Sequence, residues 1–459
     1  MKKKILGLFT LVLTVLLLAS CSGGANAKRD HLVFYVWGDP TEVACYEEIA
    51  RNYEAKRGFK VEVVAATGDY YQNLNRRFSS TNTAPDIFFT EPGEFLSHLA
   101  SKKILNLQSY IDSGRLSVKK TPDGKGNIEL WDVNDAYKYD GSTVGQGDYY
   151  ALIKDWSPDF VLWYNKSHID EYNSTHGYQP SNPNYMNYPS ETVPMTWDEF
   201  LDMSHKLTTE DHYGTMLDRV PYKHLMEWIQ MTGSSTWDSE NKQFNYQDPG
   251  VKKAFEFFTN LQVGDKASSP VIGPQPYTSG DGFLNQKVSF VFFGNWAYST
   301  YKWNNAGFEI GYAPSPVPAK ADGSALTADD TYAGSCGMIA LGIYKNSPNV
   351  ARAVDFLNYY MTYGNLLMAN KGFNIPGNKV VANSKSFTEN DDSTLALINQ
   401  YFLNIANNYT HPIIYNNYMS QKKFEDLLGL HMPPYLNNPT GKSLDSVLES
   451  IADEVKQRV

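Results

Sequence analysis

Short apolar runs alternate with amphipathic stretches along the first part of the chain. Buried strands are predicted at residues 31–39, 59–66 and 84–90, which are rich in β-branched and aromatic side chains. Between them, residues 41–57 and 70–80 place apolar side chains at helical spacing. A strand–helix–strand–helix–strand order predicts a parallel sheet with crossover helices.

The ends of several predicted elements carry recognisable signals. Thr41 suits the N-cap of the first helix, and Gly58 ends its pattern. Thr196 and Glu199 have the spacing of a capping box at the start of a later helix. Residues 111–148 are rich in glycine and predict loops. Elsewhere the pattern predicts a strand at 338–344 and helices at 195–208, 217–233, 248–262, 349–362 and 443–459.

The first twenty residues have the parts of a secretory signal peptide. Three lysines precede the apolar segment Ile5–Leu18, which is too short and too abruptly ended to predict a spanning helix. The segment ends Leu-Ala-Ser-Cys and resembles a bacterial lipobox, in which Cys21 receives the lipid. We therefore expect a lipoprotein signal peptide at 1–20 and a lipid-anchored tether at 21–29. The alternative is an ordinary signal peptide with an incidental cysteine.

Composition narrows the possible classes of protein. A chain of 459 residues is longer than one hydrophobic core usually serves, so two lobes are expected. A net charge of −10 without any basic run makes nucleic acid an unexpected partner. Besides Cys21 there are only Cys45 and Cys336, both predicted to be buried, and no Cys-x-x-Cys. We expect no metal, no cofactor, and membrane contact only through the lipid on Cys21.

Polar and aromatic residues follow the predicted strands where a parallel sheet binds its ligands. Such sheets hold ligands beyond the carboxyl ends of their strands. Trp37 and Asp39 follow the first strand, and Glu91 follows the third. Other roles are open for each of them: Trp37 in the core, Asp39 as a helix cap, and Glu91 as a solvated loop charge.

Five segments, in order, carry a resemblance to one family. The chain is similar to lipoproteins of the extracellular solute-binding family that serves carbohydrate ABC importers. Two departures concern local loops: Ile153 stands where the family usually has Pro, and Thr83 where it usually has Gly. The matching segments are APDIFF from residue 84, YYALIKDWSPDFVLWYNKSHI from 149, VPMTWDEFLDMSHKLT from 193, GDGFLNQKVSFVFFGNWA from 280 and MIALGIYKNSPNVARAVDFLNYYMT from 338.

The resemblance implies an α/β, two-lobed periplasmic-binding-protein fold with a hinge and a ligand cleft between the lobes. Lobe one would comprise 28–148 plus 314–371, and lobe two 149–313 plus 372–459. The implied protein is a monomer on the outer face of the cytoplasmic membrane or in the periplasm. It would capture a sugar or oligosaccharide and deliver it to the permease subunits of an ABC importer, without catalysing a reaction.

A sugar cleft needs two kinds of contact. The apolar faces of a sugar pack on flat aromatic rings, and its hydroxyl groups need paired donors and acceptors because an unpaired buried polar group costs about 1–3 kcal/mol. For several candidates, a place in the core or a role as a helix cap is the alternative to ligand binding. This holds above all for Trp228, which lies within an apolar helical stripe. The predicted ligand-binding residues are Trp37, Asp39, Glu91, Asp155, Trp156, Trp228, Asn295, Trp296, Phe373 and Asn374.

Aromatic residues also cluster after the apolar run that ends at Gly294. Trp296 comes before the helix expected there, and in the resembling family this turn points its aromatic residue into the cleft. Tyr298 and Tyr301 lie three apart and share a helical face. We therefore predict that Trp296 is the stacking platform and that Tyr298, Tyr301 and Trp303 pack against the lobe.

The rival interpretations are a secreted lipoprotein hydrolase acting on carbohydrate and a surface adhesin. Ser335 lies in Ala-Gly-Ser-Cys-Gly, which resembles a nucleophile elbow, but an elbow needs a strand before and a helix after the serine. Here a loop is predicted before it and a strand after it. Pro-Thr-Gly-Lys-Ser at 439–443 lacks the first glycine of a P-loop, because Leu436 stands there. Paired carboxylates for glycoside hydrolysis stay open at this point.

We expect Cys21→Ala to release the protein from membranes and to leave its body folded, because anchor and fold are separate segments. Fractionation with a carbonate wash, followed by circular dichroism of the released protein, measures both effects. A variant that stays in the washed membranes would contradict the prediction.

Overall fold

The computed structural model describes most of the chain beyond its N-terminal segment. The predicted signal peptide, Cys21 and residues up to 28 lie outside the described part, as does Ser335. No helix within the described part is long and apolar enough to cross a membrane. The described residues are 29–120, 126–217, 221–263, 277–320, 323–325, 336–410, 416 and 418–458.

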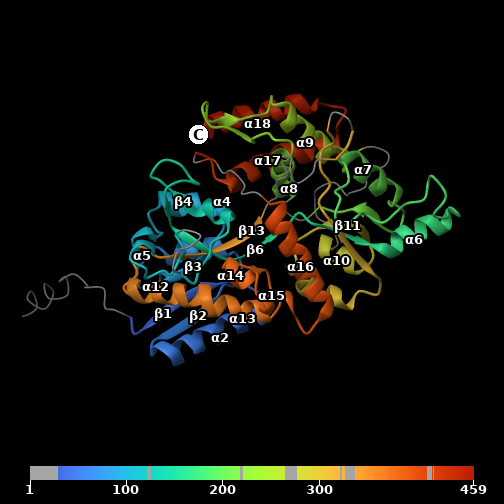
Figure 1. The fold of residues 1–459 in the computed structure, drawn as a ribbon. Helices are drawn as coiled ribbons and strands as arrows, with labels where there is room; N and C mark the ends of the chain where they lie inside the picture. Colours follow the sequence, from blue (N-terminus) through green and yellow to red (C-terminus); the bar gives the residue numbers. More distant parts are fainter. Residues whose placement is uncertain are drawn as a thin grey trace, which may run out of the picture.

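A six-stranded sheet forms the centre of the first lobe (Figure 1). Its first three strands in sequence, β1, β2 and β3, are parallel, as the sequence predicts, and two helices connect them. β13 pairs antiparallel with β3 and β6, and β14 pairs antiparallel with β6. In the order β14-β6-β13-β3-β1-β2 the strands are Ile375–Pro376, Ala151–Pro158, Cys336–Ile343, Ile87–Thr90, His31–Val36 and Lys60–Ala65.

The helices of this lobe begin and end for local reasons. α2 (Pro40–Arg57) is capped by Asp39, whose carboxylate accepts the amides of Thr41 and Glu42, so the prediction of Thr41 as the N-cap is wrong. The helix ends at Gly58, as predicted, with φ of 67°. The other helices here are α3 (Tyr70–Arg77), α4 (Pro92–Ala100), α5 (Gln108–Asp112), α12 (Val350–Tyr359), α13 (Asn365–Asn370), α14 (Lys379–Ala382) and α15 (Lys385–Thr388).

A four-stranded sheet forms the centre of the second lobe. The strand order is β12-β7-β11-β8, that is Ile310–Ala313, Leu162–Asn165, Val288–Phe292 and Tyr213–Thr215. α7 (Trp197–Lys206) starts with the predicted capping box of Thr196 and Glu199. The other helices of this lobe are α6 (Lys166–Thr175), α8 (Pro221–Met231), α9 (Pro249–Asn260), α10 (Ser279–Leu284) and α11 (Trp296–Thr300).

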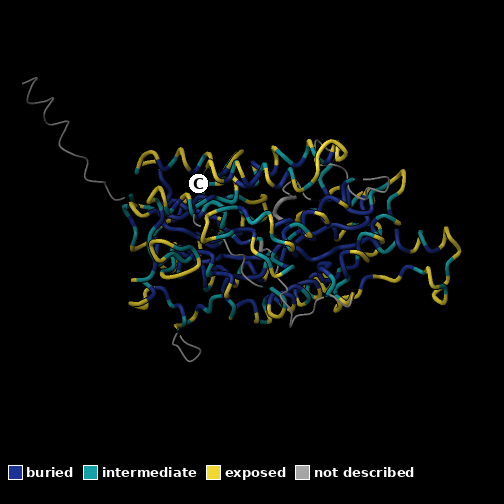
Figure 2. The backbone as a smooth tube through the Cα atoms, turned by 90° about the horizontal axis from the view of Figure 1, so that it is seen from above, coloured by how far each residue is buried: buried dark blue, intermediate teal, exposed yellow. Residues whose placement is uncertain are grey.

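Three long C-terminal helices complete the molecule. α17 (Gln421–Asn437) contacts α4 in the first lobe and α8 in the second, and α18 (Leu444–Arg458) packs on α17. α16 (Ser393–Asn408) stands between the two halves of the molecule in Figure 1 and contacts β6. Figure 2 shows buried backbone running through both halves, with exposed residues along the outer surface.

Short elements fill the connections. The glycine-rich region 111–148 is mostly irregular but contains a 3₁₀ helix at Asp132–Tyr137 and a small hairpin of β4 (Lys138–Tyr139) and β5 (Asp148–Tyr149). A second hairpin joins β9 (Trp237–Asp238) to β10 (Gln243–Phe244). Trp303–Asn305 is a further 3₁₀ turn, and Tyr360–Gly364 is a π-helical turn between α12 and α13.

The sheets divide the chain differently from the predicted lobe boundaries at two places. β6 and β14 belong to the six-stranded sheet, although residues from 149 and from 372 were expected in lobe two. The reason is that β6 pairs with β13, which lies far away in the sequence, and β14 in turn pairs with β6. β13 begins at Cys336, so a strand and not a helix comes directly after Ser335, as predicted.

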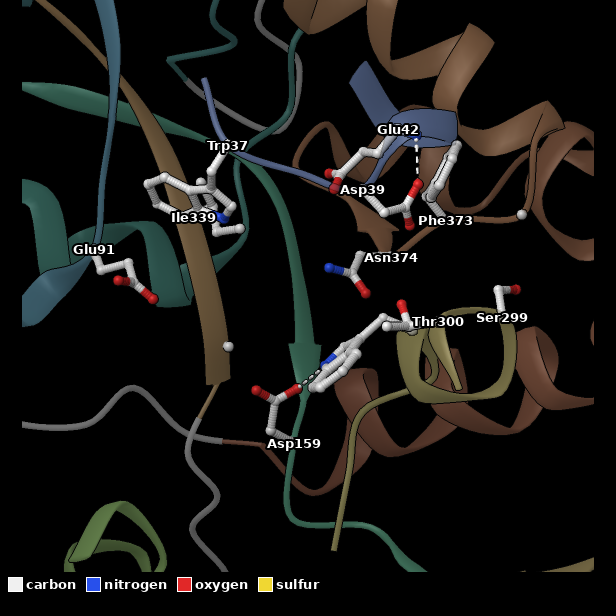
Figure 3. A pocket seen from close by; sticks show the side chains of 13 residues that line it. Trp37, Asp39, Glu42, Glu91, Asp159, Ser299, Thr300, Ile339, Phe373 and Asn374 are labelled. Carbon is white, nitrogen blue, oxygen red and sulfur yellow. Dashed lines mark hydrogen bonds between the residues drawn. The ribbon is translucent and has the colours of Figure 1, made fainter. Parts of the chain in front are cut away.

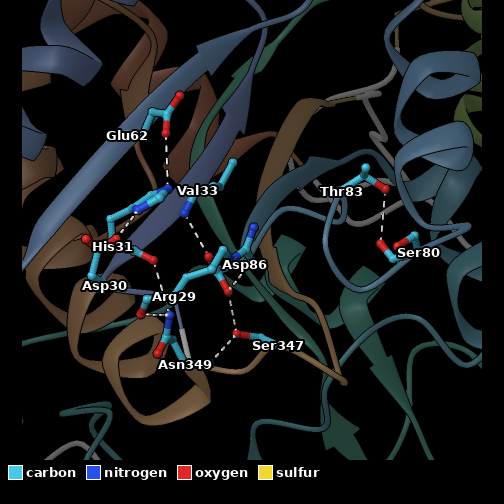
Figure 4. A network of polar contacts seen from close by, with 10 residues as sticks. All are labelled: Arg29, Asp30, His31, Val33, Glu62, Ser80, Thr83, Asp86, Ser347 and Asn349. Carbon is cyan, nitrogen blue, oxygen red and sulfur yellow. Dashed lines mark hydrogen bonds and ion pairs between the residues drawn. The ribbon is translucent and has the colours of Figure 1, made fainter. Parts of the chain in front are cut away.

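Asp86, which directly precedes β3, joins the start of β1 to the segment that follows β13 (Figure 4). Its buried carboxylate accepts the amide of Val33 at 2.7 Å and pairs with Arg29 Nη2 at 2.8 Å. Ser347 donates its hydroxyl to the same carboxylate. Arg29, which the predicted ranges assign to both the tether and lobe one, is therefore part of the folded body. Asn349 adds bonds from its side-chain amide to the carbonyls of Arg29 and His31.

Replacing Asp86 should destabilise the first lobe. Asp86→Ala leaves a buried amide and a partly buried arginine without their acceptor, and we expect the free energy of unfolding to fall by about 3 kcal/mol. Denaturant titration followed by circular dichroism measures the loss. Asp30→Ala is the control, since this side chain is almost wholly exposed and should leave the stability unchanged. Equal stability of the two variants would contradict the structural role of Asp86.

Candidate functional site

A pocket of about 270 Å³ lies where the two lobes meet (Figure 3). One wall comes from the carboxyl ends of β1 and β3, the start of α2, and β13. The other comes from α11 and from the segment that leaves β6. Its lining residues are Trp37, Asp39, Glu42, Glu91, Asp159, Trp296, Ser299, Thr300, Gly337, Ile339, Gly372, Phe373 and Asn374.

Six of the ten predicted ligand-binding residues line this pocket. They are Trp37, Asp39, Glu91, Trp296, Phe373 and Asn374. Asp39 lines the pocket and caps α2 as well, so the two roles weighed for it are compatible. The sequence brings these residues together because the parallel strands β1 and β3 end at the same edge of the sheet. Ligand binding by any of them remains a prediction.

Trp296 forms the floor of the pocket on the side of the second lobe. Its indole N–H donates to Asp159 Oδ1 at 2.9 Å, and the edge of Phe293 meets its ring at 5.3 Å between centroids. These contacts fix the plane of a ring that stays partly exposed. α11 begins at Trp296 itself, whereas Trp296 was expected to come before the helix. Ser299 and Thr300, three and four residues later, lie on the same helical face and also line the pocket.

The other aromatic residues of this segment pack into the second lobe, as predicted. Tyr298 and Trp303 are buried. Tyr301 is partly buried and stacks on Trp303, with centroids 5.9 Å apart. The aromatic residues that follow Gly294 therefore divide into one ring at the pocket and three that support it.

Two glycines make room for Asp159. A Cβ on Gly337 would lie 2.1 Å from Asp159 Oδ2, and a Cβ on Gly294 would lie 2.3 Å from Asp159 Oδ1. Both distances are far below contact, so any larger residue would displace the carboxylate. Gly294 does not have a positive φ. Its role is therefore to allow the Asp159 carboxylate to lie close to the backbone.

Trp37 and Glu91 lie on the side of the first lobe. The Trp37 ring meets Tyr70 and Phe89 edge to face, with centroids 4.4 and 4.9 Å apart, which holds it against the sheet. Glu91 Oε2 accepts the hydroxyl of Tyr71 at 3.0 Å. Figure 3 shows Glu91 and Asp39 on opposite sides of the open space, with Asn374 reaching in between.

A buried ion network lies behind the pocket. Lys154 Nζ is 3.3 Å from Glu42 Oε1 and also pairs with Asp155 Oδ2. Tyr46 donates its hydroxyl to Glu42, and Asn374 Nδ2 donates to Asp155 Oδ1 at 3.4 Å. Glu42 and Asn374 both line the pocket and belong to this network, so they connect the pocket to the buried charges of Lys154 and Asp155.

Burial and charge shift the pKa values of this network. Burial raises the pKa of the Glu42 carboxyl, although Lys154 opposes the shift. Burial acts to lower the pKa of the Lys154 ammonium, but the carboxylates of Asp155 and Glu42 outweigh it and raise that pKa. Lys154 therefore stays charged.

A bulge in β6 explains how Lys154 reaches its partners. Ile339 pairs with Asp155 and Ala340 pairs with Ile153, so Lys154 is the extra residue on its strand. Its carbonyl accepts Asn365 Nδ2 and the amide of Gly377 instead of a β13 amide. The bulge breaks the strict alternation of side chains, and neighbouring Lys154 and Asp155 can therefore meet.

Four predicted site residues do not line the pocket, and the structure corrects their placement. Asp155 is 3% exposed and committed to Lys154 and Asn374. Trp156 is buried with its ring against Trp131, and Trp228 is 1% exposed within a cluster that includes Phe257.

Asn295 is the fourth. It is buried and exchanges hydrogen bonds with Ser157, whose hydroxyl donates to Asn295 Oδ1 at 3.0 Å and accepts the Asn295 amide at 3.1 Å. Asn295 Nδ2 also donates to Asn399 Oδ1. These bonds join the end of β6 to the start of α11, so Asn295 supports Trp296 from behind.

Sequence reasoning missed several lining residues. Asp159 directly follows the strand that holds the predicted pair Asp155 and Trp156, so the strand-end argument applied to it as well. Glu42 is three residues after Asp39 on the same helix, and that spacing was the available signal. The list of missed residues is Glu42, Asp159, Ser299, Thr300, Gly337, Ile339 and Gly372.

Comparisons with known proteins agree with this geometry. The sequence profile of the family described as bacterial extracellular solute-binding protein matches residues 48–394. No curated protein matches the chain.

Solved structures share the fold at low sequence identity. An ABC substrate-binding protein from Listeria monocytogenes in complex with cycloalternan is 17% identical, with a TM-score of 0.70 over 93% of this chain and 98% of that one. A solute-binding protein from Thermotoga lettingae bound to α-D-tagatose is 18% identical, with a TM-score of 0.68 over 94% and 99%. Maltose-bound MalE3 of T. maritima is 17% identical, with a TM-score of 0.66 over 94% and 100%.

Trp296 and Trp228 form a matched pair for separating pocket from core. Trp228→Ala should lower the free energy of unfolding by about 3–5 kcal/mol, because it empties a closed cluster. Trp296→Ala should lower it by less than about 2 kcal/mol, because one side of its ring faces the pocket. Denaturant unfolding without ligand measures both. Equal losses would place Trp296 in the core.

Proposed function

We propose, from the premise that the chain belongs to the bacterial extracellular solute-binding protein family, that it captures a sugar or short oligosaccharide between its lobes and delivers it to the permease of an ABC importer. The observation that carries the proposal is the pocket between the lobes, where aromatic rings and polar side chains come from both sides. Sugars bound to neighbouring structures, such as cycloalternan and α-D-tagatose, support a carbohydrate ligand.

The pocket offers the two contacts that a sugar needs. Trp37 and Trp296 present ring surface from opposite lobes, suited to the apolar face of a pyranose. Asp39, Glu91 and Asn374 supply oxygen acceptors for hydroxyl groups. A neutral hydroxyl that donates to a carboxylate forms a charge-assisted bond, which is about twice as strong as a neutral one.

Closure of the lobes would complete the site. Trp37 and Asp39 move with the first sheet, and Trp296 moves with the second, so only a closed form brings both sets onto one ligand. The chain passes between the sheets after Pro158, between Ala313 and Cys336, and again beyond β14. We propose these passages as the hinge. The lobes then follow the predicted ranges, except that β6 and β14 go to lobe one.

Anchoring and assembly are part of the same proposal. Lipid on Cys21 would hold the protein on the outer face of the cytoplasmic membrane or in the periplasm, as a monomer that meets the permease subunits in its closed form. Within the family and among the similar structures the proteins bind their ligands and are not enzymes. No observation favours the carbohydrate hydrolase.

Calorimetry with a sugar panel tests the proposal, and solution scattering tests closure. One sugar should bind, remain unchanged after incubation, and reduce the radius of gyration. Trp296→Ala should weaken that binding by at least about 2 kcal/mol, as interface aromatics do. Tyr363→Ala is the matched control, because this ring is 53% exposed and does not line the pocket.

Three outcomes would contradict parts of the proposal. Failure of every sugar to bind would remove the function. Turnover of the sugar would favour the hydrolase. Tight binding without compaction would confine the site to one lobe and remove the hinge.

A further inference from the structure

The first three strands of the first sheet begin on one surface of lobe one. β1, β2 and β3 are parallel, so their starts share the edge of the sheet opposite to the edge at the pocket. The helices that follow these strands, α2, α3 and α4, run back from the pocket side and end here. We call the strand starts at 31, 60 and 87, with these helix ends, the amino-end surface. Figure 4 shows part of it, around Arg29 and Asp86.

Basic residues close each of the three helices. A helix C-terminus favours cations, because the carbonyl dipoles point toward it. Since all three helices end at one edge of the sheet, their basic residues gather on one surface. Lys56 and Arg57 close α2, Arg76 and Arg77 close α3, and Lys102 and Lys103 follow α4.

Three further cations have no role at a helix C-terminus. Lys60 is the first residue of β2. Arg352 lies over the ring of Phe59, with Cζ 5.1 Å from its centre, and belongs to the first turn of α12, where the dipole disfavours a cation. Lys345 follows β13, and its amide donates to the carbonyl of Lys103 at 2.8 Å. All three side chains are exposed. The surface therefore gathers more positive charge than the helices require.

Acidic side chains are fewer at the amino-end surface, within the part of the chain that the structure describes. The carboxylate of Glu62 lies 3.1 Å from His31 Nε2. That of Asp355 lies 3.5 Å from Arg57 Nε. The chain as a whole has a net charge of −10, so this surface is opposite in sign to the molecule that carries it. The acidic residues are Asp30, Glu54, Glu62 and Asp355.

The chain enters the folded body at this same surface. Arg29 is the first described residue, and it pairs with Asp86 directly before β3. Cys21 comes only eight positions earlier in the sequence. If Cys21 carries a lipid, as proposed, the amino-end surface is the part of the body next to the bilayer. A short tether raises the effective concentration of lipid headgroups at that surface.

We propose that the amino-end surface binds the anionic surface of a lipid bilayer. This inference goes beyond ligand capture, and it uses the proposed lipid on Cys21 only for the position of the tether. Each Lys or Arg near such a bilayer strengthens binding about fivefold, and the attraction falls off within a Debye length. In the docked state, lobe one stands on the bilayer with its pocket edge directed away from the lipid.

Sedimentation with vesicles at low salt tests the inference. The protein is the mature chain from residue 21 on, with Cys21→Ala so that it carries no lipid of its own. Vesicles of phosphatidylglycerol mixed with phosphatidylcholine are compared with vesicles of phosphatidylcholine alone. Binding should require phosphatidylglycerol and should weaken steeply as salt is added. The assay contains no sugar, so its result does not depend on the ligand of the pocket.

Two triple variants locate the contact. Lys60→Gln, Lys345→Gln and Arg352→Gln together remove three exposed charges from the amino-end surface and leave the helix C-termini intact. Affinity for the anionic vesicles should fall about tenfold or more. The control removes three exposed lysines from α18, the turn before it and the β9–β10 hairpin, and should leave the affinity unchanged. It combines Lys242→Gln, Lys442→Gln and Lys456→Gln. Circular dichroism checks that both variants fold.

Four outcomes would overturn the inference and leave sugar capture intact. The first is no binding to the anionic vesicles. The second is equal binding to phosphatidylcholine alone, which would indicate an apolar attachment. The third is an equal loss of affinity in both triple variants, which would reduce the effect to overall charge. The fourth is tighter binding to soluble polyglutamate than to the vesicles, which would indicate an acidic protein partner.

Discussion

The buried ammonium of Lys154 is the constraint on which the pocket depends. An ion in the interior of a protein must be paired, because its desolvation is otherwise too costly. Lys154 is paired with Glu42 at the start of α2 and with Asp155 on its own strand. Asp155 in turn accepts from Asn374, next to β14. One charge thereby fixes three elements that meet at the ligand side of the first lobe.

The carboxyl end of the same strand, β6, makes hydrogen bonds to residues of the second lobe. Ser157 holds Asn295, and Asp159 holds the indole of Trp296. Gly294 and Gly337 allow that carboxylate to lie against the backbone. The position of the Trp296 ring is therefore set by the strand that leaves the first sheet. A movement at this strand end would turn the Trp296 ring relative to Trp37. Closure of the lobes would therefore change the geometry of the pocket directly.

The sequence predicted the parts of the molecule that depend on neighbouring residues. The order of β1, β2 and β3 followed from local periodicity, and Trp37, Asp39 and Glu91 were placed at the pocket because strand ends gather at one edge. Asp155 and Trp156 were expected at the end of a strand, but β6 continues past them to Pro158 and pairs with β13 on one side and β14 on the other. Its partner strand, β13, begins 178 residues after Pro158, and no local pattern reveals such a pairing. For Trp228 the sequence left the core and the pocket open as alternatives, because a buried helical stripe and an exposed one have the same spacing, and the structure places it in the core.

The ion pair between Arg29 and Asp86 has a mechanical consequence for the anchored protein. It attaches the chain to lobe one at the amino end of β1, whereas the pocket lies at the carboxyl end, a strand length of about 20 Å away. If Cys21 carries the lipid, as proposed, the chain from Cys21 to Arg29 can span at most about 28 Å. In the proposed closure, lobe one would then be the attached half of the molecule and lobe two the moving half. The attachment point at Arg29 and the pocket lie at opposite ends of β1, so the chain before Arg29 would not obstruct entry of the ligand.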